Sequence, residues 1–213
     1  MRLIILPMCF VVVPLFGQWS LLLERAGASG QDLPKATLAD SGQAVSGTPK
    51  WGGGFIVTAS RRAFQFGPYW ALEGCLEYSQ VRAEGTLLRG ASPQGTTIKG
   101  QGAGLGLNAL GRVPFLGVSG EIGLTQRFSH NTFETPGAST SKDLSRTWIR
   151  FGIRWESPMV GVHPFLAASY QQQANESLSE KRTSAASLTS YVGDLGHSQD
   201  FGDIWTFGVG VNF

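Results

Sequence analysis

The end of the chain alternates large apolar residues with small or polar ones. From position 205 onward the apolar residues fall at every second position: Trp205, Phe207, Val209, Val211 and Phe213. Successive side chains on a strand point to opposite faces, so this spacing predicts a strand over 203–213 with one continuous apolar face. The other face carries only Thr, Gly and Asn beside these residues. Such a strand suits a wall with lipid outside and a narrow interior.

The same period of two recurs along most of the chain and predicts further strands. The sequence predicts strands over 51–59, 69–79, 98–112, 118–128, 146–156, 161–173 and 203–213. A barrel in lipid cannot leave an open edge, and single-chain barrels of this class have an even number of strands. The eighth is predicted over 18–28, with Trp19, Leu21 and Leu23 outward and Glu24 inward. The predicted fold is all-β, an eight-stranded antiparallel up-and-down transmembrane β-barrel.

The links between these strands alternate in length. Short links are expected at 60–68, 113–117 and 157–160, and long polar ones at 29–50, 80–97, 129–145 and 174–202. This asymmetry is typical of short periplasmic turns and long extracellular loops. Because the long segments are rich in Ser, Thr, Gly, Gln and Asn, we expect mobile loops there.

Aromatic residues gather near both ends of the predicted strands. With both termini periplasmic, the expected girdle residues are Trp19, Trp70, Trp155 and Phe213 at the inner rim, and Trp51, Tyr78, Phe128, Tyr170 and Trp205 at the outer rim. The stretch from Trp70 to Tyr78, tilted in a barrel, would span roughly 20 Å, close to the apolar band of about 25 Å. The alternative is a soluble β-sandwich, which would need a partner sheet for every aromatic face.

The N-terminus predicts export. Arg2 followed by an apolar stretch to Phe16 is typical of a signal peptide over 1–17, and 18–213 would form the barrel. An alternative cut after residue 28 matches Ala26-Gly27-Ala28 but would remove the first strand, so we favour the earlier cut. No later segment holds the roughly 18 consecutive apolar residues of a membrane-spanning helix.

Composition narrows the function classes. Charged residues make up 15% of the chain, against roughly 25% in soluble domains, and Gly numbers 29. The net charge is +2 with no basic run, which argues against nucleic-acid binding. Cys75 is the only cysteine after the predicted signal peptide, so no internal disulfide is expected. Cys75 is interpreted as a small buried residue, with a reactive thiol as the lesser alternative.

Charged residues on the predicted inner faces form the most informative polar set. These are Glu24, Glu73, Glu77, Glu121, Arg127, Arg150, Arg154 and Glu156. Unpaired buried charges are costly, so opposite signs in a narrow lumen should pair. The first interpretation is an ion-pair network that closes the lumen, and the alternative is a gated polar path for protons or small ions.

A catalytic role would require an acyl-transfer site on the predicted barrel. Acyl transfer needs a nucleophile, a base and a group that orients the base. The histidines are His130, His163 and His197, and only His130 with Thr132 imitates a His-x-Ser pair, without an assured carboxylate. We therefore expect no enzyme, no cofactor and no metal site.

Several stretches resemble one known family. Trp70 to Gly74, Leu107 to Gly117 and Gly120 to Thr125 resemble the transmembrane domain of the OmpA-like outer-membrane barrels, and the terminal Phe213 resembles their C-terminal signature. The resemblance implies a Gram-negative outer membrane, with its lipid and lipopolysaccharide as neighbours, and a monomer. It also implies that the barrel-assembly machinery reads the last strand. A structural or surface-contact role is expected first, a small-solute or ion channel second and a lipid A-modifying enzyme third.

Overall fold

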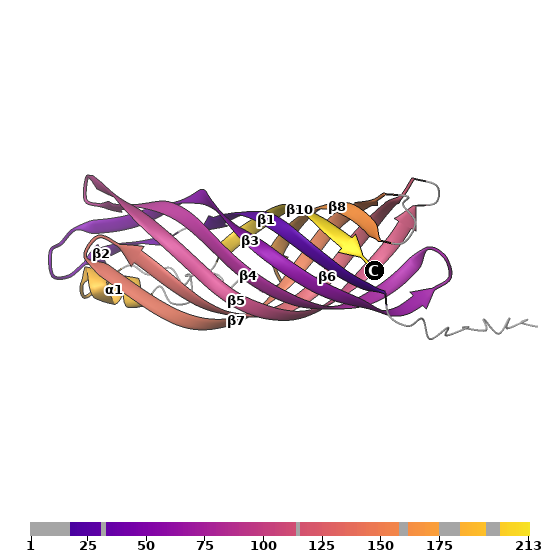
Figure 1. Cartoon of the computed structure of the whole chain (residues 1–213). Coiled ribbons are helices and arrows are strands. Elements are labelled where there is room, and N and C mark those ends of the chain that lie inside the picture. Colours follow the sequence, from indigo (N-terminus) through magenta and orange to yellow (C-terminus); the bar gives the residue numbers. More distant parts are fainter. Residues whose placement is uncertain (1–17, 31–32, 114–115, 158–161, 175–183, 195–200) are drawn as a thin grey trace, which may run out of the picture.

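The computed structural model in Figure 1 describes residues 18–30, 33–113, 116–157, 162–174, 184–194 and 201–213. The predicted signal peptide, 1–17, lies outside these residues. The elements are β1 (Trp19–Gly30), β2 (Leu33–Leu38), β3 (Ala44–Phe66), β4 (Trp70–Arg89), β5 (Ser92–Val113), β6 (Val118–Thr135), β7 (Ala138–Glu156), β8 (His163–Gln173), β9 (Ser184–Ala185), α1 (Leu188–Asp194) and β10 (Phe201–Asn212). Among the described residues no helix has the length and apolar character that crossing a membrane requires.

Eight of the described strands close into a ring. Each pairs antiparallel with its neighbours in the order β1, β3, β4, β5, β6, β7, β8 and β10, and β1 then pairs with β10. At the closing joint, the amide of Trp19 donates to the carbonyl of Phe213 at 3.0 Å, and the reverse bond is 2.9 Å. The predicted all-β, eight-stranded antiparallel up-and-down barrel is confirmed.

The strands extend much farther than predicted. β4 runs for 20 residues and β5 for 22, and they are joined by a tight turn in which Gly90 has a φ of 59°. A similar turn at Gly137 joins β6 to β7. The expectation of long mobile loops over 29–50, 80–97 and 129–145 was therefore wrong, because most of these residues lie in paired strands. In 174–202, the described part holds β9 and α1.

The reason for this error is an inversion of the hydrophobic pattern along single strands. On β4, the outward residues change from apolar ones such as Leu76 to the polar Gln80 and Arg82. The inward residues change in the opposite sense, from Glu77 to Val81. A search for outward apolar faces consequently stops where the strand itself continues.

The barrel thus has two parts, which we call the wall and the head. The wall comprises the ring from the end that holds Phe213 up to the row that holds Tyr78 and Phe128. The head comprises β2, β9, α1 and the ring beyond that row. Figure 1 shows β2 and α1 at one end of a long cylinder and the C-terminus at the other.

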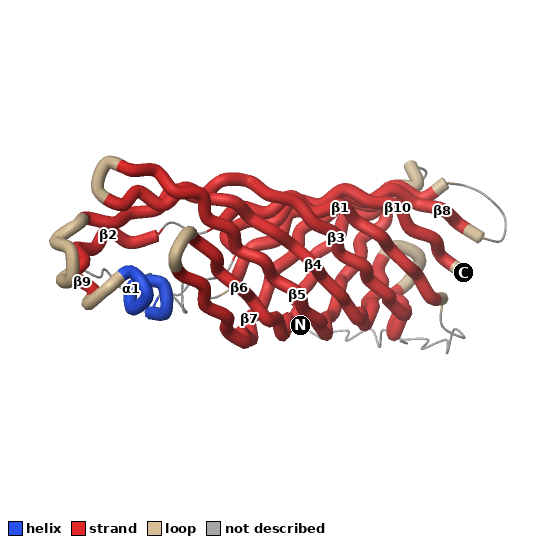
Figure 2. Tube along the Cα trace, turned by 60° about the vertical axis from the view of Figure 1, so that its left-hand side comes forward, coloured by secondary structure: helices blue, strands red, loops and turns tan. Residues whose placement is uncertain are grey.

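The head is filled by an apolar core. Buried residues of this core are Leu38, Val45, Ile56, Val81, Ala83, Leu87, Ile98, Phe133, Trp148, Leu188, Tyr191, Val192, Phe201 and Ile204, together with smaller alanines. Helix α1, blue in Figure 2, lies at the end of the cylinder and contributes Leu188, Tyr191 and Val192. Ser187 caps this helix, because its Oγ accepts from the amide of Ser190 at 3.2 Å. The interior of the head is therefore a packed apolar core, like that of a small globular protein.

Candidate functional sites in the lumen and on the outer wall

The interior of the wall carries a chain of alternating charges. Arg150 makes two bonds to Glu24, at 2.6 and 2.9 Å, and its Nε lies 3.2 Å from Glu121. Glu121 also accepts from Arg154 at 2.7 Å. All four side chains are at most 5% exposed. Fork-shaped guanidinium groups suit this arrangement, because each can bond two carboxylates at once.

The chain continues toward the end of the barrel that holds Phe213. Arg154 donates to Glu73 at 3.1 Å, and Glu73 lies 3.7 Å from Arg62, which is 18% exposed. Ser60 donates to the same carboxylate at 3.1 Å. Six charges of alternating sign, from Glu24 to Arg62, are thus joined in one continuous network.

A second group lies between this network and the head. Arg127 donates to Glu77 at 2.8 Å and to Gln171 at 2.8 Å. Its guanidinium stacks over the ring of Trp148, 4.8 Å from the ring centre. Trp148 also belongs to the apolar core of the head. This arginine therefore joins the polar interior of the wall to the apolar interior of the head.

The structure thus places seven of the eight expected lumen charges in buried ion pairs: Glu24, Glu73, Glu77, Glu121, Arg127, Arg150 and Arg154. Glu156 differs, because it lies in the opening of the lumen near Phe213. There it is partly exposed, pairs with Arg112 and accepts from Asn212 at 3.3 Å. It belongs to the entrance of the barrel and not to the buried network.

Arg62, Trp148 and Gln171 are among the partners of these charges that sequence reasoning missed. Arg62 lies in a segment expected to be a link, whereas β3 extends to Phe66. Trp148 and Gln171 lie within expected strands, and both occupy inward positions. Trp148 lies two positions from Arg150 on the same strand, so the alternation of a strand places both side chains inward. The spacing alone could therefore have identified Trp148 as an inward residue.

The outer surface of the wall is predominantly apolar and is bordered by aromatic residues. Exposed aromatics near one end are Trp19, Trp70, Trp155 and Phe213, and those near the head are Trp51, Tyr78, Phe128 and Trp205. Tyr170 is half-buried and packs on Trp205 with ring centres 4.8 Å apart. Outward polar residues within the band bond each other: Gln126 donates to Ser145 at 2.8 Å and accepts from Thr147 at 2.6 Å.

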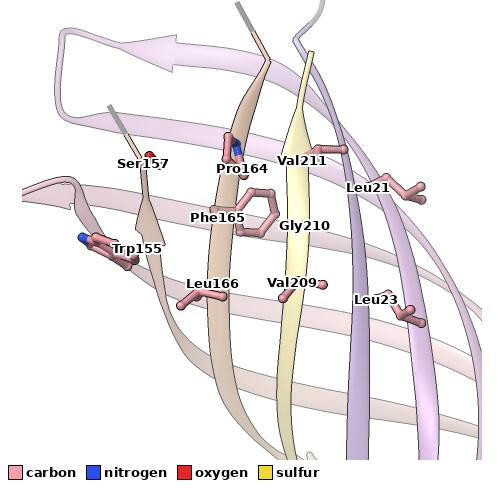
Figure 3. Close-up of a pocket in the computed structure, with 10 residues that line it drawn as sticks. All are labelled: Leu21, Leu23, Trp155, Ser157, Pro164, Phe165, Leu166, Val209, Gly210 and Val211. Carbon is pink, nitrogen blue, oxygen red and sulfur yellow. The ribbon is translucent and has the colours of Figure 1, made fainter. Parts of the chain in front are cut away.

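The final strand presents its apolar face outward, as the sequence predicts. Trp205, Phe207, Val209 and Phe213 are each more than half exposed. Val211 lies beside them and lines a hollow of about 520 Å³ with Leu21, Leu23 and Leu166 (Figure 3). At Gly210 a Cβ would lie 2.2 Å from the ring of the inward Phe165, so the close approach of that ring requires a glycine. Apart from Ser157, the residues that line the hollow are apolar or glycine, and such a lining suits acyl chains.

Candidate chemistry outside the lumen is sparse. Among the described residues, no group of three or more His, Cys, Asp or Glu side chains could hold a metal ion. Cys75 is a buried free cysteine. His130 Nδ1 lies 2.7 Å from Asp143 on the neighbouring strand, the carboxylate partner that the sequence did not reveal. Thr132 bonds Ser141 at 2.9 Å. His163 lies at the start of β8, and His197 is outside the described residues.

Comparison with known proteins finds similar structures but no protein or family of similar sequence. No protein-family model matches the sequence, and neither does any curated protein. Six chains of solved structures match. One is the crystal structure of Ail, the attachment invasion locus protein of Yersinia pestis, in complex with the heparin analogue sucrose octasulfate. The two chains are 14% identical, the match covers 92% of this chain and 99% of that chain, and the TM-score is 0.49. The fold assignment rests on the ring of paired strands itself.

Proposed function

We propose that this protein is an integral outer-membrane barrel with a closed interior, and that its head makes contacts at the cell surface. The observation that carries the proposal is the inversion of polarity between wall and head. Below the outer aromatic row, apolar side chains face outward and charges face inward, which is stable only with lipid around the barrel. Above that row the polar side chains face outward, as they do in water.

Several features support the outer membrane as the location. A closed ring of strands with an apolar outer band, and aromatic rows at both borders of that band, are typical of bacterial outer-membrane barrels. In this proposal, lipid and lipopolysaccharide surround the wall, and the barrel-assembly machinery recognises β10. The chain would act as a monomer after removal of a signal peptide over 1–17, since a cut after residue 28 would remove most of β1.

A contact role fits the interior better than a channel does. The wall is crossed by the network from Glu24 to Arg62, and the head above it is filled by apolar side chains and covered by α1. An ion would have to displace buried pairs and then cross a dry core. The polar outer face of the head is what remains available to partners.

Cysteine labelling on intact cells tests the placement. Ser139 is exposed near the end of the head, and Gln65 is exposed near the opposite end. With a membrane-impermeant maleimide, we expect Ser139→Cys to be labelled on intact cells and Gln65→Cys only after lysis. The unchanged chain is the control, because Cys75 is buried. Equal labelling of both positions on intact cells would contradict the proposal.

Conductance in planar bilayers separates contact from transport. We expect no large and steady conductance from the refolded chain, because the lumen is filled from wall to head. A stable open level with the refolded chain would favour the channel alternative instead.

One observation favours a second candidate function, modification of lipid A. The pair of His130 and Asp143 lies on the outer face just beyond Phe128, where a lipid headgroup would lie, and Thr132 follows on the same face. A carboxylate that orients a histidine is part of an acyl-transfer site. Incubation with lipopolysaccharide, followed by mass spectrometry of released fatty acids, tests this function. Loss of any release in His130→Gln would identify the base.

A further inference from the structure

A groove on the outer face of the barrel begins where the apolar band ends. It crosses β3, β4, β5 and β6 and has a volume of about 450 Å³. Its polar lining consists of Gln80, Arg82, Lys99, Gln101, His130 and Thr132. No carboxylate lines it among the described residues. Phe55 borders the groove, and this ring lies 6.1 Å from that of Tyr78 in the outer aromatic row.

The strand register arranges the lining in rows. Gln80, Gln101 and His130 lie opposite one another on β4, β5 and β6, one step above the row of Tyr78 and Phe128. The next row holds Arg82, Lys99 and Thr132. Directly paired side chains of antiparallel strands begin about 5 Å apart, so Arg82 and Lys99 can contact one small anion together.

On β4 and β6 the acidic residues lie one row farther from the aromatic band, whereas Asp143 on β7 lies beside His130 in the row nearest that band. Glu84 is 3.2 Å from Arg82, and Glu134 is 2.7 Å from Lys99. Each of these four side chains is about half exposed, between 44% and 54%. The carboxylates therefore orient the two cations without covering them. On β4, β5 and β6 a row with aromatic side chains is followed by a row with amide and imidazole groups. The next row holds the two cations, and the row after that holds the two carboxylates.

The hollow itself results from glycines in β3. Gly53 faces outward between Trp51 and Phe55 and contributes no side chain to the surface. Its neighbours approach β4 closely, because a Cβ at Gly54 would lie 2.1 Å from the carbonyl oxygen of Gln80. By contrast, a Cβ at Gly53 would meet only the carbonyl oxygen of Ala26, at 3.7 Å. The groove can therefore be filled at Gly53 without disturbing the strand.

We propose that this groove binds the phosphate-bearing headgroup of a lipid in the outer leaflet. Arg82 and Lys99 would contact the phosphate, and Gln80, Gln101 and Thr132 would bond sugar or glycerol hydroxyls. The groove opens sideways, immediately beyond aromatic residues of the kind that mark a membrane interface, so the phosphates at that level belong to lipids. The inference rests on the proposed membrane placement of the wall.

The test measures lipid binding to the refolded full chain in detergent by native mass spectrometry. The probes are bis-phosphorylated lipid A and the same lipid without its phosphates. For Arg82→Gln combined with Lys99→Gln, we expect affinity for the phosphorylated lipid to fall roughly tenfold, because two cations that attract an anionic headgroup are lost. Affinity for the dephosphorylated lipid should not change.

Three further variants sharpen the result. Glu84→Gln combined with Glu134→Gln should bind the phosphorylated lipid more tightly, because the cations lose their competing partners. Gly53→Leu should weaken binding of the phosphorylated lipid by filling the groove at unchanged charge. Arg89→Gln is the matched control, since it removes a cation of the same strand that bonds Gln43 and does not line the groove. An equal effect of Arg89→Gln and the groove variants would overturn the inference.

A separate measurement distinguishes failure of the inference from failure of the proposed function. Lipids brominated on their acyl chains should quench the outward tryptophans of the reconstituted protein. Quenching together with unaltered lipid A binding in the groove variants would refute the groove alone. Absence of quenching would refute the membrane placement and the groove with it.

Discussion

The wall and the head are built from the same strands, yet they are stabilised in opposite ways. In the wall, β4 turns Leu76 outward and Glu77 inward, and in the head it turns Arg82 outward and Val81 inward. The backbone geometry is continuous across the change, because β4 pairs with β5 residue by residue along its whole length. The period of a strand defines two faces, and the surroundings decide which face is apolar.

The two interiors also differ in how they respond to loss of a side chain. The wall depends on a few charge pairs, in which removal of one partner leaves the other buried and unpaired. The head depends on many dispersed apolar contacts, where removal of one side chain leaves a cavity. Four changes, from the largest expected effect to the smallest, test this difference.

Arg150→Met should have the largest effect, because it leaves Glu24 and Glu121 buried without their shared cation. We expect a loss of about 3–5 kcal/mol in the free energy of unfolding, and no large steady conductance. Urea unfolding in detergent and planar-bilayer recording measure the two quantities. Arg61→Met is the control, since Arg61 lies on the outside over the ring of Trp19. Equal stability of the two variants would contradict a structural role for the network.

Leu38→Ala should act on the head more than on the wall. Leu38 is fully buried in the core of the head, and its truncation should cost about 2–5 kcal/mol there. Hydrogen exchange should accelerate in β2 and α1 and stay slow in the wall segments of β4 and β5. Leu88→Ala is the matched control, because Leu88 is exposed on the outer face of the head. Uniform acceleration throughout the ring would show that head and wall unfold together.

Alkaline pH should loosen the head through Tyr191. Burial raises the pKa of Tyr191 to about 12, compared with about 10 in an unfolded chain. The buried, protonated Tyr191 therefore makes its full contribution to the free energy of unfolding of the head below about pH 10. This contribution is lost as the pH rises toward 12, because only the unfolded head releases the proton in that interval. The absorbance difference between the unchanged chain and Tyr191→Phe isolates this titration. A midpoint near 10 would show that the ring is not buried.

Lys99→Gln should have the smallest effect on stability. The pair of Lys99 and Glu134 is half exposed, and surface pairs of this kind contribute less than about 1 kcal/mol. The same urea measurement as for Arg150→Met checks this value. A loss as large as that of Arg150→Met would remove the distinction between a surface pair and a lumen pair.

The sequence predicts the wall well and the head poorly. The alternation of apolar and polar positions predicts β1 and β10 and places Arg150 and Glu121 inside, because an apolar outer face and a charged inner face alternate residue by residue. The head has the opposite phase, so Val81 and Phe133 looked like parts of polar loops. Contacts between distant strands, such as His130 with Asp143, depend on register, which a single sequence does not specify.

The closing joint of the barrel has a consequence for how it opens. β2 directly follows β1, and β9 with α1 precedes β10, so both strands of the joint continue into the head. There β2 pairs with β9 in parallel, with Thr37 opposite Ser184 and Leu38 opposite Ala185. The ring is therefore held together twice, once along β1 and β10 and again by β2 and β9 in the head. Lateral separation of the first and last strands requires the upper fastening to come apart as well.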